Sequence, residues 1–187
     1  GHSLGGAALV MAAARRPDAF RSLWLFEPII PPPGGFGGPD GGGENPMAEG
    51  AARRRPTFDS LDAAYDNYAS KPPLNAFHPE ALRGYVGGGF EPLPDGTVTL
   101  RCRPEWESAI FRMTGGCPAF DVLPDVDIPV TVVVGEELPF GPAAFAPHVA
   151  EALPNGRLVR HPELSHFGPL QDPLGLAAEA AGWVAGG

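Results

Sequence analysis

A run of β-branched residues, Val130 to Val134, limits the folds open to this chain more than any other stretch. Such residues favour strands, and a run without alternating polar residues is typical of a strand that is covered on both faces. Pro129 precedes the run, and Gly135 ends it. Strands of this kind occur in parallel sheets with helices packed on both sides, so the run predicts an α/β architecture.

Helices and strands alternate around this run. The apolar segment from Leu4 to Arg16 predicts a helix that is buried on most sides and ends at Pro17. Residues 21–26 predict a short strand. Three more elements are expected after the valine run, a helix, a strand and a closing helix, over residues 143–153, 157–160 and 174–184. This order predicts a parallel sheet with right-handed crossovers.

The middle of the chain has a different character. Residues 29–43 are rich in glycine and proline and predict a loop. From Glu44 to Gly116, Pro and Gly interrupt short helical stretches. We therefore divide the chain into an α/β core, residues 1–43 and 117–187, and a mainly helical insertion, residues 44–116.

Local signals place elements within the insertion. Asp59, with Asp62 three residues later, is expected to cap one helix. Pro79 and Pro104 occupy positions typical of the first residue of a helix. Residues 97–103 alternate in the manner of a half-buried strand or an extended connection.

Composition excludes several classes of function. The chain has 22 acidic and 13 basic residues, a net charge of −9, so we expect no nucleic-acid partner. Its two cysteines, Cys102 and Cys117, form neither a Cys-x-x-Cys pair nor a disulfide framework. We therefore expect reduced thiols and no structural metal. No apolar run reaches the length of about eighteen residues that a membrane span needs.

The first five residues, Gly-His-Ser-Leu-Gly, fit the pattern Gly-x-Ser-x-Gly. In this pattern a serine occupies a sharp turn between a strand and a helix, and the small residues around it, including Gly6, avoid side-chain clashes. Backbone N–H groups at a helix amino end favour a developing negative charge. We therefore expect Ser3 to be a nucleophile and the Leu4 N–H to be one oxyanion donor.

A serine nucleophile needs a base, and the chain has five histidines. His166 follows the last predicted strand and precedes the last helix, in an irregular segment that can reach back over the sheet edge. The other four histidines have simpler structural explanations. His2 neighbours the serine, His78 is expected to cap a helix, His148 lies in the middle of a helix and His161 ends a strand. We predict that His166 is the base.

Two positions can supply the acid that orients this base. Glu27 directly follows the strand predicted over residues 21–26, whereas Glu136 and Glu137 follow the valine run. Both positions lie at the carboxyl ends of parallel strands, where ligands bind. Glu27 is our preferred acid, and Glu136 or Glu137 is the alternative.

These segments together resemble the carboxyl-terminal two thirds of an α/β-hydrolase-fold enzyme. GHSLGG resembles the nucleophile elbow, the insertion resembles the cap or lid, VTVVVGEE the penultimate strand and SHFGPLQDP the histidine loop. WLFEPI resembles the segment of haloalkane dehalogenases and related members in which the acid follows the sixth strand, and this favours Glu27. Many members carry an aspartate where this chain has Leu138. The dehalogenases use an aspartate nucleophile, so Ser3 points to esterase-like, lipase-like or carbon–carbon bond hydrolases instead.

The resemblance implies a cofactor-free hydrolase with a Ser-His-Glu triad. Its expected substrate is a small hydrophobic molecule whose ester, related acyl bond or carbon–carbon bond is cleaved. Four aromatic residues of the insertion could line the substrate pocket or form plain core: Tyr65, Tyr68, Trp106 and Phe111. The alternatives are an acyltransferase on the same fold and a non-catalytic, truncated α/β-hydrolase-like protein.

The resemblance also implies strands and a second oxyanion donor ahead of Gly1. We therefore expect that the chain lacks its amino-terminal part and that, alone, it is poorly folded or inactive. We expect a cytoplasmic protein, and the oligomeric state stays open.

Overall fold

The computed structural model describes residues 1–35, 46–113 and 117–186. The chain forms two compact units: unit 1 comprises Gly1–Gly42 and Gly115–Gly187, and unit 2 comprises Gly43–Thr114. These bounds lie within two residues of the predicted division. Most of the glycine-rich segment, residues 36–43, lies outside the described residues.

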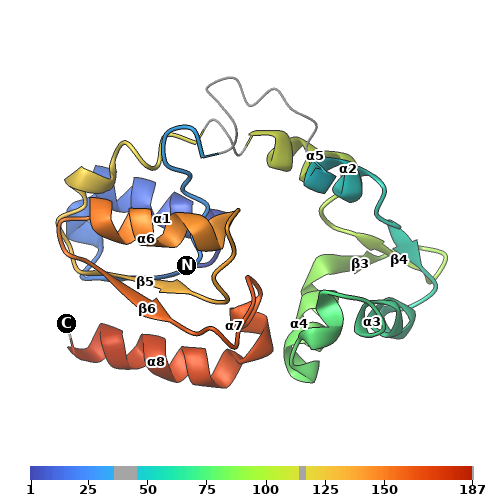
Figure 1. The fold of residues 1–187 in the computed structure, drawn as a ribbon. Coiled ribbons are helices and arrows are strands. Elements are labelled where there is room, and N and C mark those ends of the chain that lie inside the picture. The colour runs from blue at the N-terminus through green and yellow to red at the C-terminus, as the bar shows by residue number, and fades with distance from the viewer. Residues whose placement is uncertain (36–45, 114–116, 187) are drawn as a thin grey trace. The chain divides into compact units, whose positions relative to one another are not determined.

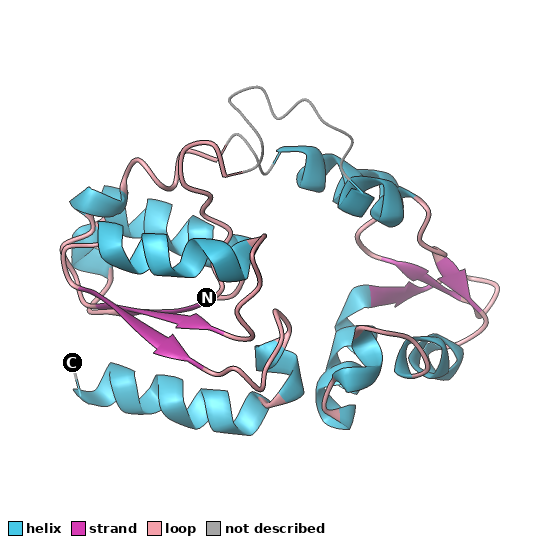
Figure 2. Ribbon diagram, in the orientation of Figure 1, coloured by secondary structure: helices cyan, strands magenta, loops and turns pink. Residues whose placement is uncertain are grey.

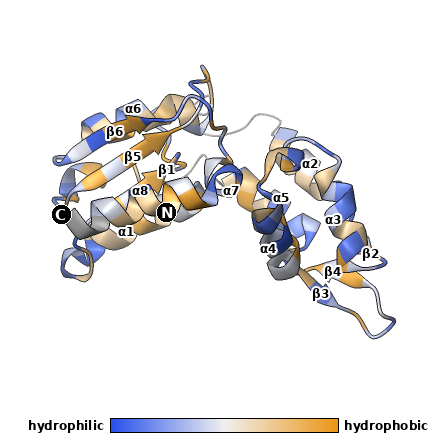
Figure 3. Cartoon of the chain, turned by 90° about the horizontal axis from the view of Figure 1, so that it is seen from below, coloured by the Kyte–Doolittle hydropathy of each residue, from blue (hydrophilic) through white to orange (hydrophobic). Residues whose placement is uncertain are grey.

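Unit 1 contains a three-stranded parallel sheet in the order β1-β5-β6. Its strands are β1 (Leu23–Phe26), β5 (Val130–Val134) and β6 (Gly156–Arg160). Leu25 pairs with Val132 in register, and Val132 pairs with Leu158. The predicted strand over the valine run is therefore present as the central strand of this sheet, and it is hydrophobic along nearly its whole length (Figure 3).

Helices cover both faces of this sheet (Figure 1). One face carries α1 (Leu4–Arg15) and α6 (Pro142–Ala152), and the other carries α8 (Pro173–Gly186). The 3-10 turns η1 (Pro17–Ala19) and η4 (Leu123–Asp125) and the short helix α7 (Gly168–Gln171) complete the unit. None of the described helices has the length and hydropathy to cross a bilayer.

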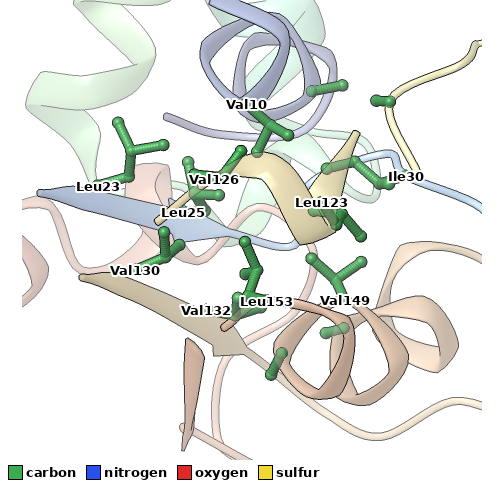
Figure 4. Packing of buried hydrophobic residues seen from close by; sticks show 14 of the residues in the cluster. Val10, Leu23, Leu25, Ile30, Leu123, Val126, Val130, Val132, Val149 and Leu153 are labelled. Carbon is green, nitrogen blue, oxygen red and sulfur yellow. The ribbon is translucent and has the colours of Figure 1, made fainter. Parts of the chain in front are cut away.

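Each face of the sheet has its own apolar core. Val10, Leu25, Val132 and Val149 belong to the cluster that joins the sheet to α1 and α6 (Figure 4). A smaller cluster on the α8 face contains Phe26, Val133, Leu164 and Leu176. Successive strand residues point to opposite faces, so the two clusters alternate along β1 and β5. Burial on both faces explains why β5 is almost entirely apolar, and its one polar side chain, Thr131, accepts a hydrogen bond from the Arg157 Nε at 3.0 Å.

Unit 2 combines helices with a small antiparallel sheet, which Figure 2 shows in magenta. Its strands, in the order β2-β4-β3, are β2 (Thr57–Phe58), β3 (Phe90–Pro92) and β4 (Val98–Leu100). The helices are α2 (Pro46–Ala52), α3 (Leu61–Ala69), the turn η2 (Leu74–Ala76), α4 (Pro79–Gly89) and α5 (Pro104–Met113). Pro79 and Pro104 begin helices as predicted.

One local prediction is wrong. Ser60, not Asp59, caps α3, and its hydroxyl accepts a hydrogen bond from the Ala63 N–H at 3.1 Å. The predicted helix is present as α1 and is at least partly buried on most sides: Gly6, Ala7, Val10 and Ala13 are buried, and Leu9, Met11 and Ala14 pack against the same core. Its exposed residues are Leu4, Gly5, Ala8 and Arg15.

Candidate active site

Ser3 occupies a sharp turn between a sheet-paired segment and α1. His2 forms a parallel bridge with Phe26 at the end of β1, and the Ser3 N–H donates to the Phe26 carbonyl at 3.1 Å. Ser3 is the residue that precedes α1, with φ 55° and ψ −128°. This positive φ is strained for a residue with a side chain, and it turns the hydroxyl out at the amino end of the helix.

The space around this turn depends on glycines, but not on every glycine of the motif. A Cβ on Gly1 would lie 2.7 Å from the Leu9 Cδ1, and one on Gly6 would lie 2.8 Å from the Pro28 Cβ. A Cβ on Gly5 would meet nothing within 4 Å. Close packing therefore requires glycine at Gly6, whose neighbour is a rigid proline ring, whereas at Gly1 the end of the Leu9 side chain would have to move. The second glycine of the motif, Gly5, is not needed for space among the described residues.

His166 lies in the loop between β6 and α7. Its Nε2 is 3.1 Å from the Ser3 Oγ, and 28% of its side chain is exposed. The loop is held to α7 by Ser165, whose N–H and hydroxyl both donate to the Gln171 Oε1, at 2.8 and 2.9 Å. Two residues 163 positions apart in the chain thus meet at hydrogen-bond distance.

Glu27 follows β1 directly and is 1% exposed. Its Oε2 is 2.7 Å from the His166 Nδ1, and its Oε1 accepts from the Gly135 N–H at 2.9 Å. The Glu27 N–H donates to the Val133 carbonyl at 2.8 Å, which holds this residue against β5. Both carboxylate oxygens therefore have partners, as a buried charge requires.

The structure does not bring the alternative acids to His166. Glu136 and Glu137 are exposed beyond Gly135, and Glu137 forms an ion pair with Arg160 instead. The Gly135 N–H, which the sequence did not single out, is the group of this segment that reaches the site, through Glu27. In the sequence, Gly135 was marked only as the residue that ends the valine run.

The remaining histidines have other surroundings. His2 contacts the His166 loop, because its Nε2 lies 2.8 Å from the His166 carbonyl oxygen. His78 caps α4, with its Nδ1 accepting from the Glu80 N–H at 3.3 Å, and His148 is exposed on α6. His161 binds Glu179 and Glu163.

The candidate pocket aromatics of unit 2 differ in burial. Tyr68 belongs to the core of that unit, with Phe58 at 6.0 Å and Phe90 at 6.1 Å between ring centroids. Trp106 is 54% exposed, and Tyr65 lies under the Arg83 guanidinium. Phe111 is partly buried on α5. Tyr68 therefore fits the plain-core alternative.

The described residues contain no group of three or more His, Cys, Asp or Glu residues arranged to hold a metal ion. Cys102 is exposed, Cys117 is partly buried, and both are free thiols. The polar groups that contact the Ser3 side are the His166 imidazole and, beyond it, the Glu27 carboxylate.

The arrangement around Ser3 is suited to proton transfer. A carboxylate accepts from the His166 Nδ1–H and fixes the tautomer, so Nε2 is left to accept the Ser3 hydroxyl proton. The Leu4 N–H opens α1 and, as the first amide of a helix, has no acceptor within that helix. The Leu4 N–H could therefore donate a hydrogen bond to an anion that forms beside Ser3.

Comparisons with known structures identify the fold. No protein-family model matches the chain, and no curated protein sequence matches it either. A peroxisomal alpha-beta-hydrolase of Saccharomyces cerevisiae is 17% identical and superposes with a TM-score of 0.80 over 99% of this chain and 52% of its own. E-2-(acetamidomethylene)succinate hydrolase is 22% identical, with a TM-score of 0.70 over 100% of this chain and 65% of its own. An esterase of Mycobacterium tuberculosis is 20% identical, with a TM-score of 0.65 over 99% of this chain and 59% of its own.

The chain has the α/β-hydrolase fold, as its resemblance at the sequence level implied. It spans about half to two thirds of the length of these solved structures.

Proposed function

We propose that the protein is a serine hydrolase that cleaves an ester or related acyl bond of a small hydrophobic substrate. The observation that carries this proposal is the continuous chain of hydrogen bonds from the Ser3 Oγ through the two His166 nitrogens to the Glu27 Oε2, at 3.1 and 2.7 Å. The described neighbours, which include a hydrolase and an esterase, support the same general class.

In the proposed reaction, the Ser3 Oγ attacks the carbonyl carbon while its proton moves to the His166 Nε2. Negative charge develops on the carbonyl oxygen, where the Leu4 N–H donates to it. The bond to the leaving alcohol then breaks, and His166 returns the proton to that oxygen. Water, deprotonated by the same nitrogen, attacks the acyl-serine ester and releases the acid and free Ser3.

Glu27 has an electrostatic role in both halves of this cycle. It is 1% exposed, so the imidazolium that forms on His166 faces a carboxylate poorly screened by water. The Gly135 N–H holds the other carboxylate oxygen, which keeps Oε2 directed at the imidazole. The role of residues 44–116 as a cap stays a prediction.

A fluorophosphonate probe tests the proposal on the protein at its natural length. Phosphonylation of Ser3 needs the activated hydroxyl, so we expect stoichiometric labelling that disappears in Ser3→Ala. Hydrolysis of a nitrophenyl ester should fall with it. A wild-type protein that is folded but takes no label is non-catalytic, and this outcome contradicts the proposal.

Acyl transfer uses the same residues and differs only in the acceptor that attacks the acyl-serine. Products formed with and without an added alcohol or amine separate the two reactions. We expect the free acid to dominate in water. If product forms only when the acceptor is present, the protein is an acyltransferase and the proposal of hydrolysis is wrong.

A further inference from the structure

His2 links the serine turn to the histidine loop by a contact that the reaction does not itself use. The His2 Nε2 lies 2.8 Å from the backbone carbonyl oxygen of His166, 164 residues away in the chain. A carbonyl oxygen only accepts hydrogen bonds, so the His2 Nε2 must carry the proton and donate it. The side chain of His2 is partly buried, and its ring centroid is 4.9 Å from that of His166.

This bond restrains the backbone of His166, which the contacts of the triad with its side chain do not hold. Glu27 and Ser3 contact the two ring nitrogens, whereas the main chain of residue 166 lies in an irregular segment between β6 and α7. His2 itself is fixed, because it bridges to Phe26 in the sheet and its neighbour Ser3 donates to the Phe26 carbonyl. The loop backbone is thus tied to the same turn that carries the nucleophile.

We propose that His2 is a positioning residue, whose Nε2–H bond to the His166 carbonyl sets the distance between the Ser3 hydroxyl and the imidazole that takes its proton. The inference rests on the proposed function. The His2 Nε2 bonds to the backbone of His166 and not to the ring nitrogens that contact Ser3 and Glu27, so His2 acts through the His166 loop.

The charge state of His2 agrees with this role. Burial lowers the pKa of His2; the bond to the His166 carbonyl and the Glu27 carboxylate oppose this effect, whereas the His166 charge adds to it. The net lowering keeps His2 neutral at pH 7. A neutral His2 places no second positive charge beside the imidazolium that forms on His166 during the reaction.

Two substitutions separate the hydrogen bond from the shape of the side chain. His2→Phe keeps a ring but removes the donor, and His2→Gln restores an N–H at about the same reach. For His2→Phe we expect kcat to fall by about 10- to 100-fold with KM changed less than about twofold, because a small misplacement of reacting groups costs rate rather than binding. For His2→Gln we expect most of the rate to return. His148→Phe, at an exposed position on α6, is the matched control and should change neither constant.

An NMR measurement gives a readout besides activity. The proton between the His166 Nδ1 and Glu27 should give a resolved downfield signal in the wild type, in His2→Gln and in His148→Phe, and a broadened one in His2→Phe. Circular dichroism checks that each variant is folded. If His2→Phe loses its fold, His2→Ala, which also lacks the donor, takes its place: a kcat lowered by about tenfold or more that His2→Gln restores supports the inference, and an unchanged kcat in His2→Ala overturns it.

The failure of this inference is distinguishable from the failure of the proposed function. A wild type that takes no fluorophosphonate label contradicts the function itself. A wild type that is labelled, together with a folded His2→Phe that keeps full kcat and an unchanged downfield signal, leaves the function intact and overturns the role of His2.

Discussion

Backbone strain marks two of the three residues in the proposed triad. Among the described residues, Ser3 and Glu27 are the non-glycine positions with positive φ, at 55° and 39°. Such conformations cost about 1–3 kcal/mol each and persist where the surrounding structure enforces them, often at functional sites. Here the enforcing contacts are backbone hydrogen bonds to Phe26 and Val133. The strain therefore supports a functional reading of both positions.

Removing the charge of Glu27 should impair catalysis far more than folding. Glu27→Gln keeps the size of the side chain but favours the wrong histidine tautomer, so we expect kcat to fall by about 10³- to 10⁴-fold. Glu137→Gln is the matched control, because Glu137 is exposed and pairs with Arg160. Steady-state ester hydrolysis measures both variants. An equal loss in the two would contradict the assignment of the acid.

Gly135 should tolerate no side chain. A Cβ there would collide with the Leu164 carbonyl oxygen and lie 3.1 Å from the Glu27 Oε1, so the loop before His166 or the carboxylate must shift. For Gly135→Ala we expect a loss of about 1–3 kcal/mol in the free energy of unfolding. We also expect a fall in kcat of about tenfold or more. Urea denaturation and ester hydrolysis measure the two effects, and an unchanged kcat would show that the site adapts.

Residue types and their order predicted Ser3, His166 and Glu27, because each has a signal in its own neighbourhood. Ser3 lies in a five-residue motif, Glu27 directly follows a strand, and His166 lies in the irregular segment between the last strand and the closing helices. The contacts of Gly135 and His2 had no such signal. Gly135 meets Glu27 through a backbone N–H across 108 residues, and His2 meets a backbone carbonyl, so neither contact depends on the identity of both partners.

At the scale of elements, one polar cluster fastens α8 to the sheet. Glu179 of α8 accepts from the Trp24 Nε1 of β1 at 3.0 Å and binds the His161 Nε2, just after β6, at 2.7 Å. Burial lowers the pKa of His161, but hydrogen bonds and charges from Glu179 and Glu163 outweigh it, so the pKa is raised from 6.5. Arg157 is the further cation near Glu179.

The attachment of α8 should therefore weaken as pH rises. With a folded-state pKa above the unfolded value, His161 contributes fully below about pH 6.5, and its contribution is lost as pH rises through the folded-state pKa. For this partly exposed pair we expect an effect of about 1 kcal/mol or less. Hydrogen exchange of the α8 amides, corrected for intrinsic rates, should show the loss. In Glu179→Gln, which keeps an acceptor for Trp24, the pH dependence should vanish; if it persists, another group is responsible.

Helix α4 offers a stabilising substitution within unit 2. Gly84 lies in the interior of the helix, and a Cβ there would meet nothing within 4 Å. Alanine loses less backbone entropy on folding, so Gly84→Ala should raise the free energy of unfolding by about 0.5–1 kcal/mol. Urea denaturation followed by circular dichroism measures this gain. A loss of stability would mean that Gly84 has a contact partner outside the described residues.

The sequence predicted long and strongly patterned elements better than short ones. The central strand and the helices that begin at Pro79 and Pro104 are present, because a β-branched run and a starting proline act locally. Strands β2 and β3 were not predicted. They have two and three residues, too few for a periodic pattern, and form because each pairs with β4.

At the scale of the whole molecule, the proposed triad belongs to one unit. Ser3, Glu27 and His166 all lie in unit 1, and the hydrogen bonds that hold them come from residues of that unit. Unit 2 has its own core, in which Phe58, Tyr68 and Phe90 pack together. The chemistry of the serine should therefore depend on the packing of unit 1 alone.

Matched core substitutions test this separation. Phe58→Ala removes a ring that is 1% exposed from unit 2 and should cost about 3–5 kcal/mol there, so proteolysis should cut within residues 46–113. Labelling of Ser3 by a small fluorophosphonate should stay within about threefold of wild type, since distant sites act independently. Leu25→Ala, at a fully buried position two residues before Glu27, should cost about 2–5 kcal/mol in unit 1 and greatly reduce labelling. If Phe58→Ala abolishes labelling as well, the nucleophile depends on unit 2, and the two units act as one catalytic body.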